Sequence, residues 1–368
     1  MNISDFKLER YFAEYEFNVK YLLCSSDCES LTIKDLLALE PGAEEKFHQQ
    51  WLGYTEYEGN PKLREEIANI YENMAPENIL VHSGAEEAIF LLMHSLLNAG
   101  DHVIVQWPCY QSLFEVANDI GCEISKWENR ETDNWAPDID ELRNLIRSKT
   151  KLIVINSPHN PTGFHFTHEM FEIINRISEE KGIIIFSDEV YRESEYDIAN
   201  RLPAACDLNP DNVSLGVMSK TYGLAGLRIG WIATRNDEIY NKIAALKDYT
   251  TICNSAPSEF LAELALSHRP KLIDRNLGII KNNISLLEKF FDKHNERFDC
   301  HKPIAGPIAF PKLKIGDVEK FCKDLVVLKG VLLLPGTKYD DEGNHFRVGF
   351  GRKNMPEALL KLEEFLIQ

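Results

Sequence analysis

Residues 151–191 read KLIVINSPHNPTGFHFTHEMFEIINRISEEKGIIIFSDEVY and contain the pattern that decides the fold. Two apolar runs, 151–156 and 182–186, have the length of buried strands. Between them, residues 167–180 repeat apolar side chains at helical spacing. Strands that are apolar throughout and are joined by a helix are typical of a parallel sheet that helices cover on both faces.

The same alternation extends toward both ends of the chain. The run NILV (78–81) precedes a predicted helix over 85–97, HVIVQ (102–106) precedes one over 111–120, and VSLGV (213–217) predicts a further strand. We therefore expect an α/β fold with a large, mostly parallel sheet. Crossover connections in such a sheet have one hand, so the carboxyl ends of the strands lie along one edge, where ligands bind.

From about residue 270 the pattern changes to a long charged helix followed by short strands. The elements expected there are three strands and a closing helix, at 307–314, 330–334, 345–350 and 355–366. Short strands interleaved with helices indicate a smaller α+β domain.

Three parts of the chain follow from these patterns. We expect an N-terminal segment (1–45) that joins the small domain and covers the site, because chain termini often lie near one another. A large domain (46–268) and a small C-terminal α+β domain (269–368) complete the division.

Composition excludes several classes of function. The 368 residues include 40 Lys and Arg against 58 Asp and Glu, a net charge of −18, which disfavours nucleic acid as a partner. Apolar runs are too short to cross a bilayer, and the opening MNISDFKLERYF is too charged for a secretory signal. The eight cysteines are then expected to be reduced thiols, with no metal site. These features predict a cytoplasmic enzyme without nucleic-acid or membrane partners.

The stretch SKTYGLAGLRIGW (219–231) is the most informative for chemistry. Lys220 follows an apolar strand, where partial burial lowers the pKa of an amine and favours Schiff-base chemistry. Arg228 could hold a phosphate with two parallel hydrogen bonds. Taken alone, the stretch could equally be a surface Ser-Lys and a glycine-rich turn.

Two neighbouring strands also end in polar residues. Asn160 follows one, and Asp188 and Tyr191 follow the next. An aspartate at the end of an apolar strand needs a charged partner, such as the protonated nitrogen of a pyridine ring. Asn160 and Tyr191 could donate hydrogen bonds to an oxygen on the same ring. A turn-forming Asn-Pro and an ordinary half-buried tyrosine are the structural alternatives.

These blocks, in this order, resemble the fold-type I, pyridoxal-phosphate-dependent class I/II aminotransferase superfamily over about residues 50–350. The resemblance implies a catalytic Lys220 that holds the cofactor as a Schiff base and Asp188 as partner of the pyridine nitrogen. It implies that Asn160 and the catalytic Tyr191 hold the ring oxygen, and that Arg228 holds the phosphate. A catalytically inactive relative would be expected to lose Lys220 or Asp188, and both are present.

The resemblance extends to the rest of the cofactor site. Gly84, Ala85 and Glu86 match the glycine-rich start of a helix whose backbone N–H groups bind phosphate. Ser219 would supply a hydroxyl, whereas Val217 stands where the family often has Ser or Thr, which removes one phosphate donor.

Three further positions match family residues that contact the cofactor or the substrate. Tyr110 would stack on the pyridine ring, and Tyr54 would reach the phosphate of a neighbouring subunit, which implies a homodimer with shared sites. Arg347 in FRVGFGR would clamp the α-carboxylate of a small amino-acid substrate, with Asn160 beside it. Packing is the alternative reading for both tyrosines.

The motifs leave the reaction open. One hypothesis is transamination from an L-amino acid to a 2-oxo acid such as 2-oxoglutarate. The other is elimination, because PHNPTG, DEVYRE and SKTYGLAGLRIGW are similar to the branch that includes capreomycidine synthase and the enduracididine-forming cyclase of the guanitoxin pathway. That similarity implies cyclodehydration of a hydroxylated arginine.

The acidic N-terminal segment favours the second hypothesis. It carries five carboxylates, at Glu9, Glu14, Glu16, Asp27 and Glu29. The segment folds over the site mouth in this superfamily, so we predict that Glu9 and Asp27 bind a guanidinium group. In a chain this acidic, solvated surface residues are the alternative. A DNA-binding regulator on this scaffold is disfavoured by the negative charge.

Overall fold

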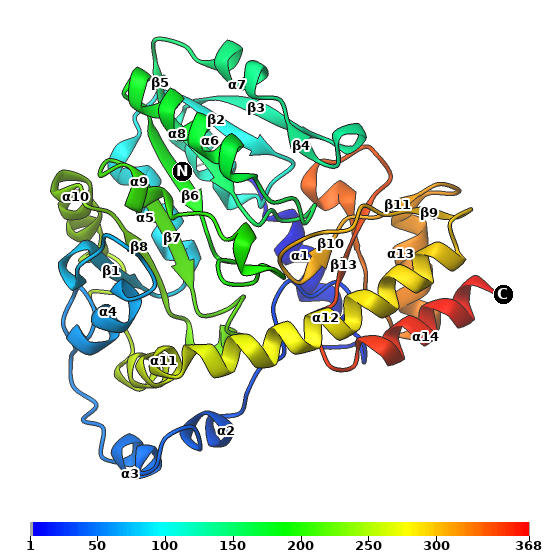
Figure 1. The fold of residues 1–368 in the computed structure, drawn as a ribbon, viewed down its shortest axis with the longest axis horizontal. Coiled ribbons are helices and arrows are strands. Elements are labelled where there is room, and N and C mark those ends of the chain that lie inside the picture. The colour runs from blue at the N-terminus through cyan, green and yellow to red at the C-terminus, as the bar shows by residue number, and fades with distance from the viewer. Residues whose placement is uncertain (1–2, 368) are drawn as a thin grey trace.

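The computed structural model describes residues 3–367 and contains a large sheet in the order β1-β8-β7-β6-β5-β2-β3-β4 (Figure 1). Its strands are β1 (Ile79–His82), β2 (His102–Trp107), β3 (Glu123–Arg130), β4 (Ala136–Pro137), β5 (Thr150–Asn156), β6 (Ile184–Asp188), β7 (Val213–Val217) and β8 (Gly230–Ala233). The pairs from β3 through β2, β5 and β6 to β7 are parallel. Strand β8 runs antiparallel to β1 and β7, and β4 runs antiparallel to β3. The predicted α/β fold is confirmed.

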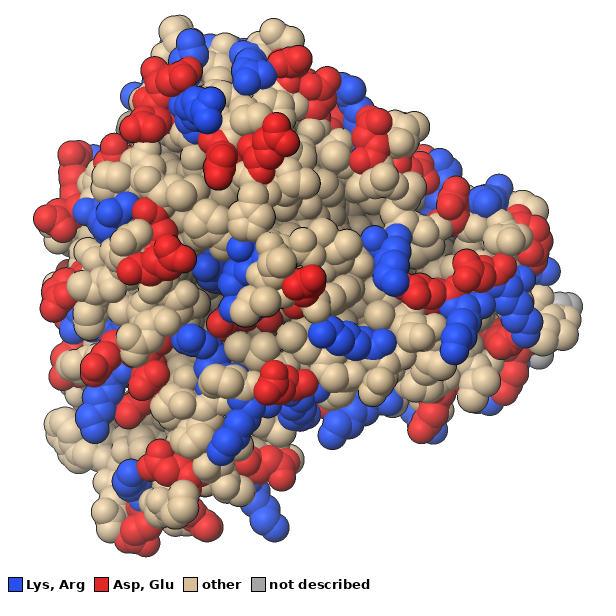
Figure 2. Space-filling model, viewed as in Figure 1, with Lys and Arg blue, Asp and Glu red and all other residues tan. Residues whose placement is uncertain are grey.

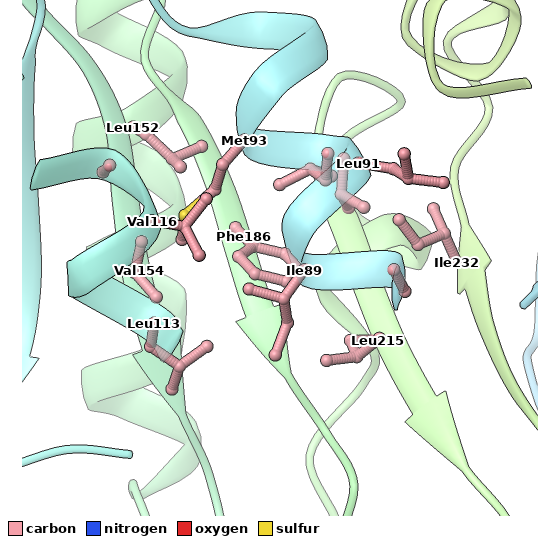
Figure 3. Close-up of a cluster of buried hydrophobic side chains, with 14 of the residues drawn as sticks. Ile89, Leu91, Met93, Leu113, Val116, Leu152, Val154, Phe186, Leu215 and Ile232 are labelled. Atoms are coloured by element: carbon pink, nitrogen blue, oxygen red, sulfur yellow. The ribbon is translucent and has the colours of Figure 1, made fainter. Parts of the chain in front are cut away.

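Helices cover both faces of this sheet (Figure 1). They are α4 (Pro61–Ala68), α5 (Ala85–Leu96), α6 (Ser112–Ile120), α7 (Ile139–Leu145), α8 (His168–Lys181), α9 (Ala205–Leu208), α10 (Asp237–Lys247) and α11 (Ala256–Ser267). Neighbouring residues of β5 point to opposite faces, so Leu152 and Val154 pack with α5 and α6, as Figure 3 shows, whereas Ile153 packs with α7 and α8. Burial on both sides explains why these strands are apolar throughout.

Local sequence signals set the ends of the crossover helices. Thr167 accepts a hydrogen bond from the backbone N–H of Met170 at the start of α8. Gly182, with φ 62°, ends the helix in the left-handed conformation that glycine adopts at little cost. Asn60 caps α4 in the same way, and Pro61 occupies its first turn, where a proline needs no backbone N–H partner.

The strand register brings together the polar residues at the ends of neighbouring strands. Asn156 pairs with Asp188 across β5 and β6, and Asp188 pairs with Leu215 across β6 and β7. Strand β6 begins and ends two residues later than its predicted run, so Asp188 lies within the strand rather than after it. The side chains that follow β5, β6 and β7 therefore share one edge of the sheet.

The sequence patterns did not indicate β3 and β8. Strand β3 alternates buried and exposed residues because it lies near the edge of the sheet, and its exposed positions are charged. Strand β8 lies in the glycine-rich stretch after Lys220, where short length and glycine obscure a strand pattern.

The C-terminal part packs around two small sheets. Its helices are α12 (Arg269–Lys293), α13 (Val318–Lys329) and α14 (Met355–Leu366), and its strands are β9 (Phe298–Asp299), β10 (Ile308–Ala309), β11 (Lys312–Leu313), β12 (Leu334–Pro335) and β13 (Phe346–Gly349). Strands β10, β13 and β12 form one sheet, and β11 pairs with β9. Helix α12 runs from the side of α11 to this part (Figure 1).

The N-terminal segment contains helices where the sequence pattern looks irregular. They are α1 (Lys7–Tyr15), α2 (Ile33–Leu37) and α3 (Ala43–His48). After α1, Tyr21 forms a parallel bridge with Val331, and Tyr21 and Leu23 lie in the C-terminal hydrophobic cluster. This packing supports the proposal that the segment joins the small domain, while the three domain boundaries stay a prediction.

Charged residues of both signs are interspersed over the face shown in Figure 2. Within residues 3–367, none of the helices combines the length and the apolar character needed to cross a membrane.

Candidate active site

A cavity of about 500 Å³ lies against the carboxyl edge of the large sheet and is bordered by α1. It brings together most of the residues that the sequence predicts for the site, namely Glu9, Asp27, Ala85, Glu86, Tyr110, Asn160, Asp188, Tyr191, Ser219, Lys220, Arg228 and Arg347. Gly84 lies next to Arg228, which lines the cavity, because a Cβ at Gly84 would meet the Arg228 guanidinium. Tyr54 does not line this cavity in the single chain, and its side chain is 83% exposed.

Lys220 lies just after β7, where the backbone turns toward the N-terminal segment. Its Nζ donates a hydrogen bond to the hydroxyl of Ser26 at 3.0 Å. Burial lowers the pKa of Lys220, and the positive charge of Arg347 adds to this, while the negative charge of Asp27 opposes it. A lower pKa increases the share of neutral amine, which is the nucleophilic and basic form.

Asp188 is a buried carboxylate whose charge is not neutralised. Burial raises its pKa to about 7, and one carboxylate oxygen accepts a hydrogen bond from the N–H of Val190 at 3.2 Å. Within residues 3–367 it forms no ion pair. A buried acid in this position is costly unless a cation pairs with it, and the protonated nitrogen of a pyridine ring is such a cation.

The start of α5 and the loop before β8 form a cradle for an anion. Gly84, with φ 85°, precedes α5, and within residues 3–367 no side-chain hydrogen bond caps the start of this helix. A Cβ at Gly84 would lie 2.5 Å from the guanidinium of Arg228, and a Cβ at Gly230 would lie 2.9 Å from the backbone N of Ala85. Free N–H groups beside an arginine are suited to bind phosphate.

Arg347 and Asn160 line the same cavity and are joined by a hydrogen bond. Arg347 is 2% exposed, and its Nε donates to the carbonyl of Cys24 at 2.9 Å. Its Nη1 donates to Asn160 Oδ1 at 3.2 Å and also to the hydroxyl of Tyr339. Tyr191 lies at the same edge and is 1% exposed.

Three carboxylates from the N-terminal segment, Glu9, Glu16 and Asp27, face the cavity. Asp27 is held by Arg352, whose Nη2 lies 2.9 and 2.8 Å from the two carboxylate oxygens. Glu9 accepts a hydrogen bond from the hydroxyl of Tyr110 at 3.2 Å. Burial raises the pKa of Glu16, and the negative charges of Glu9 and Asp27 raise it further.

Sequence reasoning did not single out Ser26, Glu16 or Tyr339 as site residues. Glu16 is one of the acidic residues noted in the segment, but its orientation depends on helix α1, which the sequence pattern does not predict. Ser26 precedes Asp27, and Tyr339 lies in a short turn of the C-terminal part, so neither has a local signal.

The residues present fit pyridoxal phosphate. Asp188 provides the anion that the ring nitrogen requires, the α5 cradle with Arg228 suits the phosphate, and Lys220 provides an amine for the aldehyde. Ser219 and Tyr110 line the same cavity, and the hydroxyl of Tyr110 donates a hydrogen bond to Glu9.

Comparison with known proteins agrees with this chemistry. The family model described as aminotransferase class I and II matches residues 19–362. Capreomycidine synthase from Streptomyces vinaceus is 28% identical over 366 residues, which cover 98% of this chain and 93% of that protein.

Solved structures match the whole fold. A pyridoxal-phosphate-dependent aminotransferase from Streptococcus suis is 32% identical, with a TM-score of 0.94 and coverage of 100% of this chain and 98% of that one. The pyridoxal-phosphate-dependent cyclase OrfR is 26% identical, with a TM-score of 0.91 and the same coverage of both chains.

Proposed function

This chain belongs to the aminotransferase class I and II family and uses pyridoxal phosphate, and on that premise we propose that it converts a hydroxylated L-arginine to a cyclic guanidino amino acid. The observation that carries the substrate class is the group of carboxylates on the cavity wall formed by the N-terminal segment. The similarity to capreomycidine synthase and to the cyclase OrfR supports the ring closure.

The acidic wall is suited to a cationic side chain. Glu9 and Glu16 form no ion pair with any side chain in residues 3–367. Burial and the negative charges of Glu9 and Asp27 raise the pKa of Glu16, although the positive charges of Arg352 and Lys220 oppose the rise. A guanidinium group would supply a further positive charge and form charge-assisted hydrogen bonds. Asp27, which Arg352 already holds, adds negative charge beside them.

A second group of residues in the cavity is suited to the common part of an amino acid. Arg347 presents a guanidinium group for the α-carboxylate, with Asn160 beside it. The cavity thus offers a positive group for the substrate carboxylate and carboxylates for its side chain, and Lys220 lines the same cavity.

Pyridoxal phosphate, when bound, withdraws electrons from Cα and so acidifies its proton. Lys220 is the base for that proton, because burial lowers its pKa. Asp188 keeps the ring nitrogen protonated, and Tyr191 and Asn160 hold the ring oxygen. Ala85, Glu86, Ser219 and Arg228 hold the phosphate.

The proposed reaction is balanced without a second substrate. The C–O bond of the side-chain hydroxyl breaks, and the hydroxide leaves with one proton as water. A guanidine nitrogen of the same molecule forms the new C–N bond and loses a proton, and Cα regains the proton that Lys220 removed, so the net change is the loss of one water. The α-amino group is retained, and no oxidant or reductant is consumed.

Mass measurement with purified holoenzyme tests this proposal. Hydroxyarginine isomers are incubated without any 2-oxo acid, and the product mass is followed. Loss of one water with the amino group retained is the expected result. Turnover only when 2-oxoglutarate is present, with glutamate formed, would contradict the cyclase and establish transamination.

Transamination is the second candidate because the Streptococcus suis structure, an aminotransferase, is 32% identical to this chain. The cofactor residues serve both reactions, so they do not discriminate between them. The acidic wall favours cyclisation, since a general amino-group transfer does not require a guanidinium site.

A homodimer with shared sites belongs to the same proposal. Tyr54 and its neighbours Trp51 and Leu52 are 83%, 80% and 79% exposed. Three large apolar side chains exposed together are suited to an interface between copies of the chain. We expect the dimer to act in the cytoplasm on a small amino-acid substrate.

A further inference from the structure

Tyr339 lies between the two residues proposed to hold the substrate carboxylate and the cofactor ring. It ends the 3₁₀ turn η5 (Gly336–Tyr339) and is 3% exposed. Its hydroxyl accepts a hydrogen bond from Arg347 Nη1 at 2.5 Å and donates one to Asn160 Oδ1 at 2.8 Å. We propose that Tyr339 is a positioning residue that fixes the orientation of the Asn160 side-chain amide.

The direction of these hydrogen bonds carries the argument. A guanidinium group has only donors, so the Tyr339 oxygen must accept from Arg347 and its proton is free to go to Asn160. Asn160 Oδ1 therefore accepts from both Tyr339 and Arg347. A rotated amide would place its NH₂ group against the arginine and the tyrosine. Both neighbours thus hold Nδ2 on the remaining side, where it is available as a donor.

The surrounding structure holds the tyrosine itself in place. Its ring packs against Phe310 with 6.1 Å between ring centroids, and burial raises the pKa of its hydroxyl to about 12, so it stays protonated. Arg347 belongs to β13, whereas Asn160 follows β5 of the large sheet. Tyr339 therefore connects a C-terminal turn to the cofactor edge of the large sheet.

This inference rests on the role proposed above for Asn160, namely that its Nδ2 donates to the ring oxygen of the cofactor. A donor to that oxygen stabilises its deprotonated form. Removing the Tyr339 hydroxyl would leave Asn160 less firmly oriented and weaken that hydrogen bond. The pH at which the visible absorption of the bound cofactor changes should then rise.

The test is a pH titration of cofactor absorption in holoenzyme without substrate, so it does not depend on which reaction the enzyme catalyses. Tyr339→Phe keeps the ring and its packing, and we expect the midpoint to rise by about 0.5–1 pH unit. Asn160→Ala should raise it at least as far. The double variant should show no further rise, because Tyr339 acts through Asn160.

Tyr196→Phe is the matched control. Tyr196 is also a tyrosine with a hydrogen-bonded hydroxyl, which donates to the carbonyl of Gly306 at 2.6 Å, away from Asn160 and Arg347. Its midpoint should equal that of the unaltered enzyme. The inference would be overturned if Tyr196→Phe raised the midpoint as much as Tyr339→Phe does, or if Tyr339→Phe did not raise it at all. It would also be overturned if adding Tyr339→Phe to Asn160→Ala raised the midpoint by the same amount as Tyr339→Phe alone. No effect of Asn160→Ala would overturn both the inference and the role of Asn160, and the mass assay for the reaction would be unaffected.

Discussion

The amine of Lys220 donates a hydrogen bond to the hydroxyl of Ser26 at 3.0 Å, although the two residues lie 194 positions apart in the chain. The contact brings the N-terminal segment to the proposed catalytic base. The backbone N–H of Cys28 also donates to the carbonyl of Lys220 at 3.2 Å, so side chain and backbone are both held from the same segment. The N-terminal segment is thus part of the site and not only a cover.

Replacing Ser26 by alanine should slow the reaction while the cofactor stays bound. The variant loses a hydrogen-bond partner of the amine, and we expect kcat to fall by about three- to tenfold. Steady-state kinetics with cofactor content measured in parallel checks this. Ser30→Ala, an exposed serine of the same segment, is the control, and an equal fall there would contradict a specific role.

Lys220→Ala should abolish turnover and covalent attachment of the cofactor. No other residue in the described cavity offers an amine, so we expect a loss of about 10³-fold or more. Borohydride reduction of holoenzyme followed by peptide mass mapping should label Lys220 in the unaltered protein. Lys242 forms a surface ion pair with Glu238, so Lys242→Ala is a control. That variant should still be labelled at Lys220. Label found elsewhere in the unaltered chain would contradict the assignment.

The raised pKa of buried Asp188 predicts that the stability of the cofactor-free protein depends on pH. Burial raises its pKa from 3.8 to about 7, so between these values the folded state binds a proton that the unfolded state has released. The free energy of unfolding therefore falls as pH rises through this window and levels off above it. Asp188→Asn lacks this contribution and should melt roughly 3–6 °C higher at pH 8, with a smaller advantage at pH 5.

Thermal melting of both proteins from pH 5 to 8 measures this difference. Bound pyridoxal phosphate should reduce it, because the ring nitrogen supplies the missing cation. Parallel curves for the two cofactor-free proteins would show that Asp188 is not the group responsible.

Glu16→Gln should weaken an arginine-like substrate selectively. The change removes a cavity-lining carboxylate that forms no ion pair within residues 3–367, so we expect KM to rise about tenfold for the guanidinium substrate. A neutral urea isostere of the same length should change less than about twofold. Glu14→Gln, at an exposed glutamate in the last turn of α1 just before Glu16, is the matched control. Equal effects on both substrates would remove the side-chain role.

Mixing two inactive variants tests the shared site. Lys220→Ala and Tyr54→Ala chains are unfolded together and refolded, or co-expressed. If Tyr54 serves the neighbouring subunit, each mixed dimer contains one native site, and an equal mixture should recover about a quarter of full activity at limiting cofactor. Absence of recovery in proven mixed dimers would place Tyr54 outside the neighbour's site.

Much of the candidate site could be predicted from sequence because it depends on local patterns and one topological rule. Apolar runs identify the parallel strands, and the constant hand of the crossovers puts their carboxyl ends on one edge. Asn160, Asp188 and Lys220 each follow or end such a strand, so their meeting in one cavity was expected. Their chemical roles stay proposals.

The amino-acid sequence by itself determined the α/β sheet and which strand ends carry polar residues, because burial on two faces leaves a continuous apolar signature. Three contacts depend on tertiary packing: Ser26 reaches Lys220, Arg352 holds Asp27, and Tyr339 joins Arg347 to Asn160. These contacts link segments far apart in the chain, and they depend on how α1 and the C-terminal turns pack. No local spacing or propensity encodes that packing.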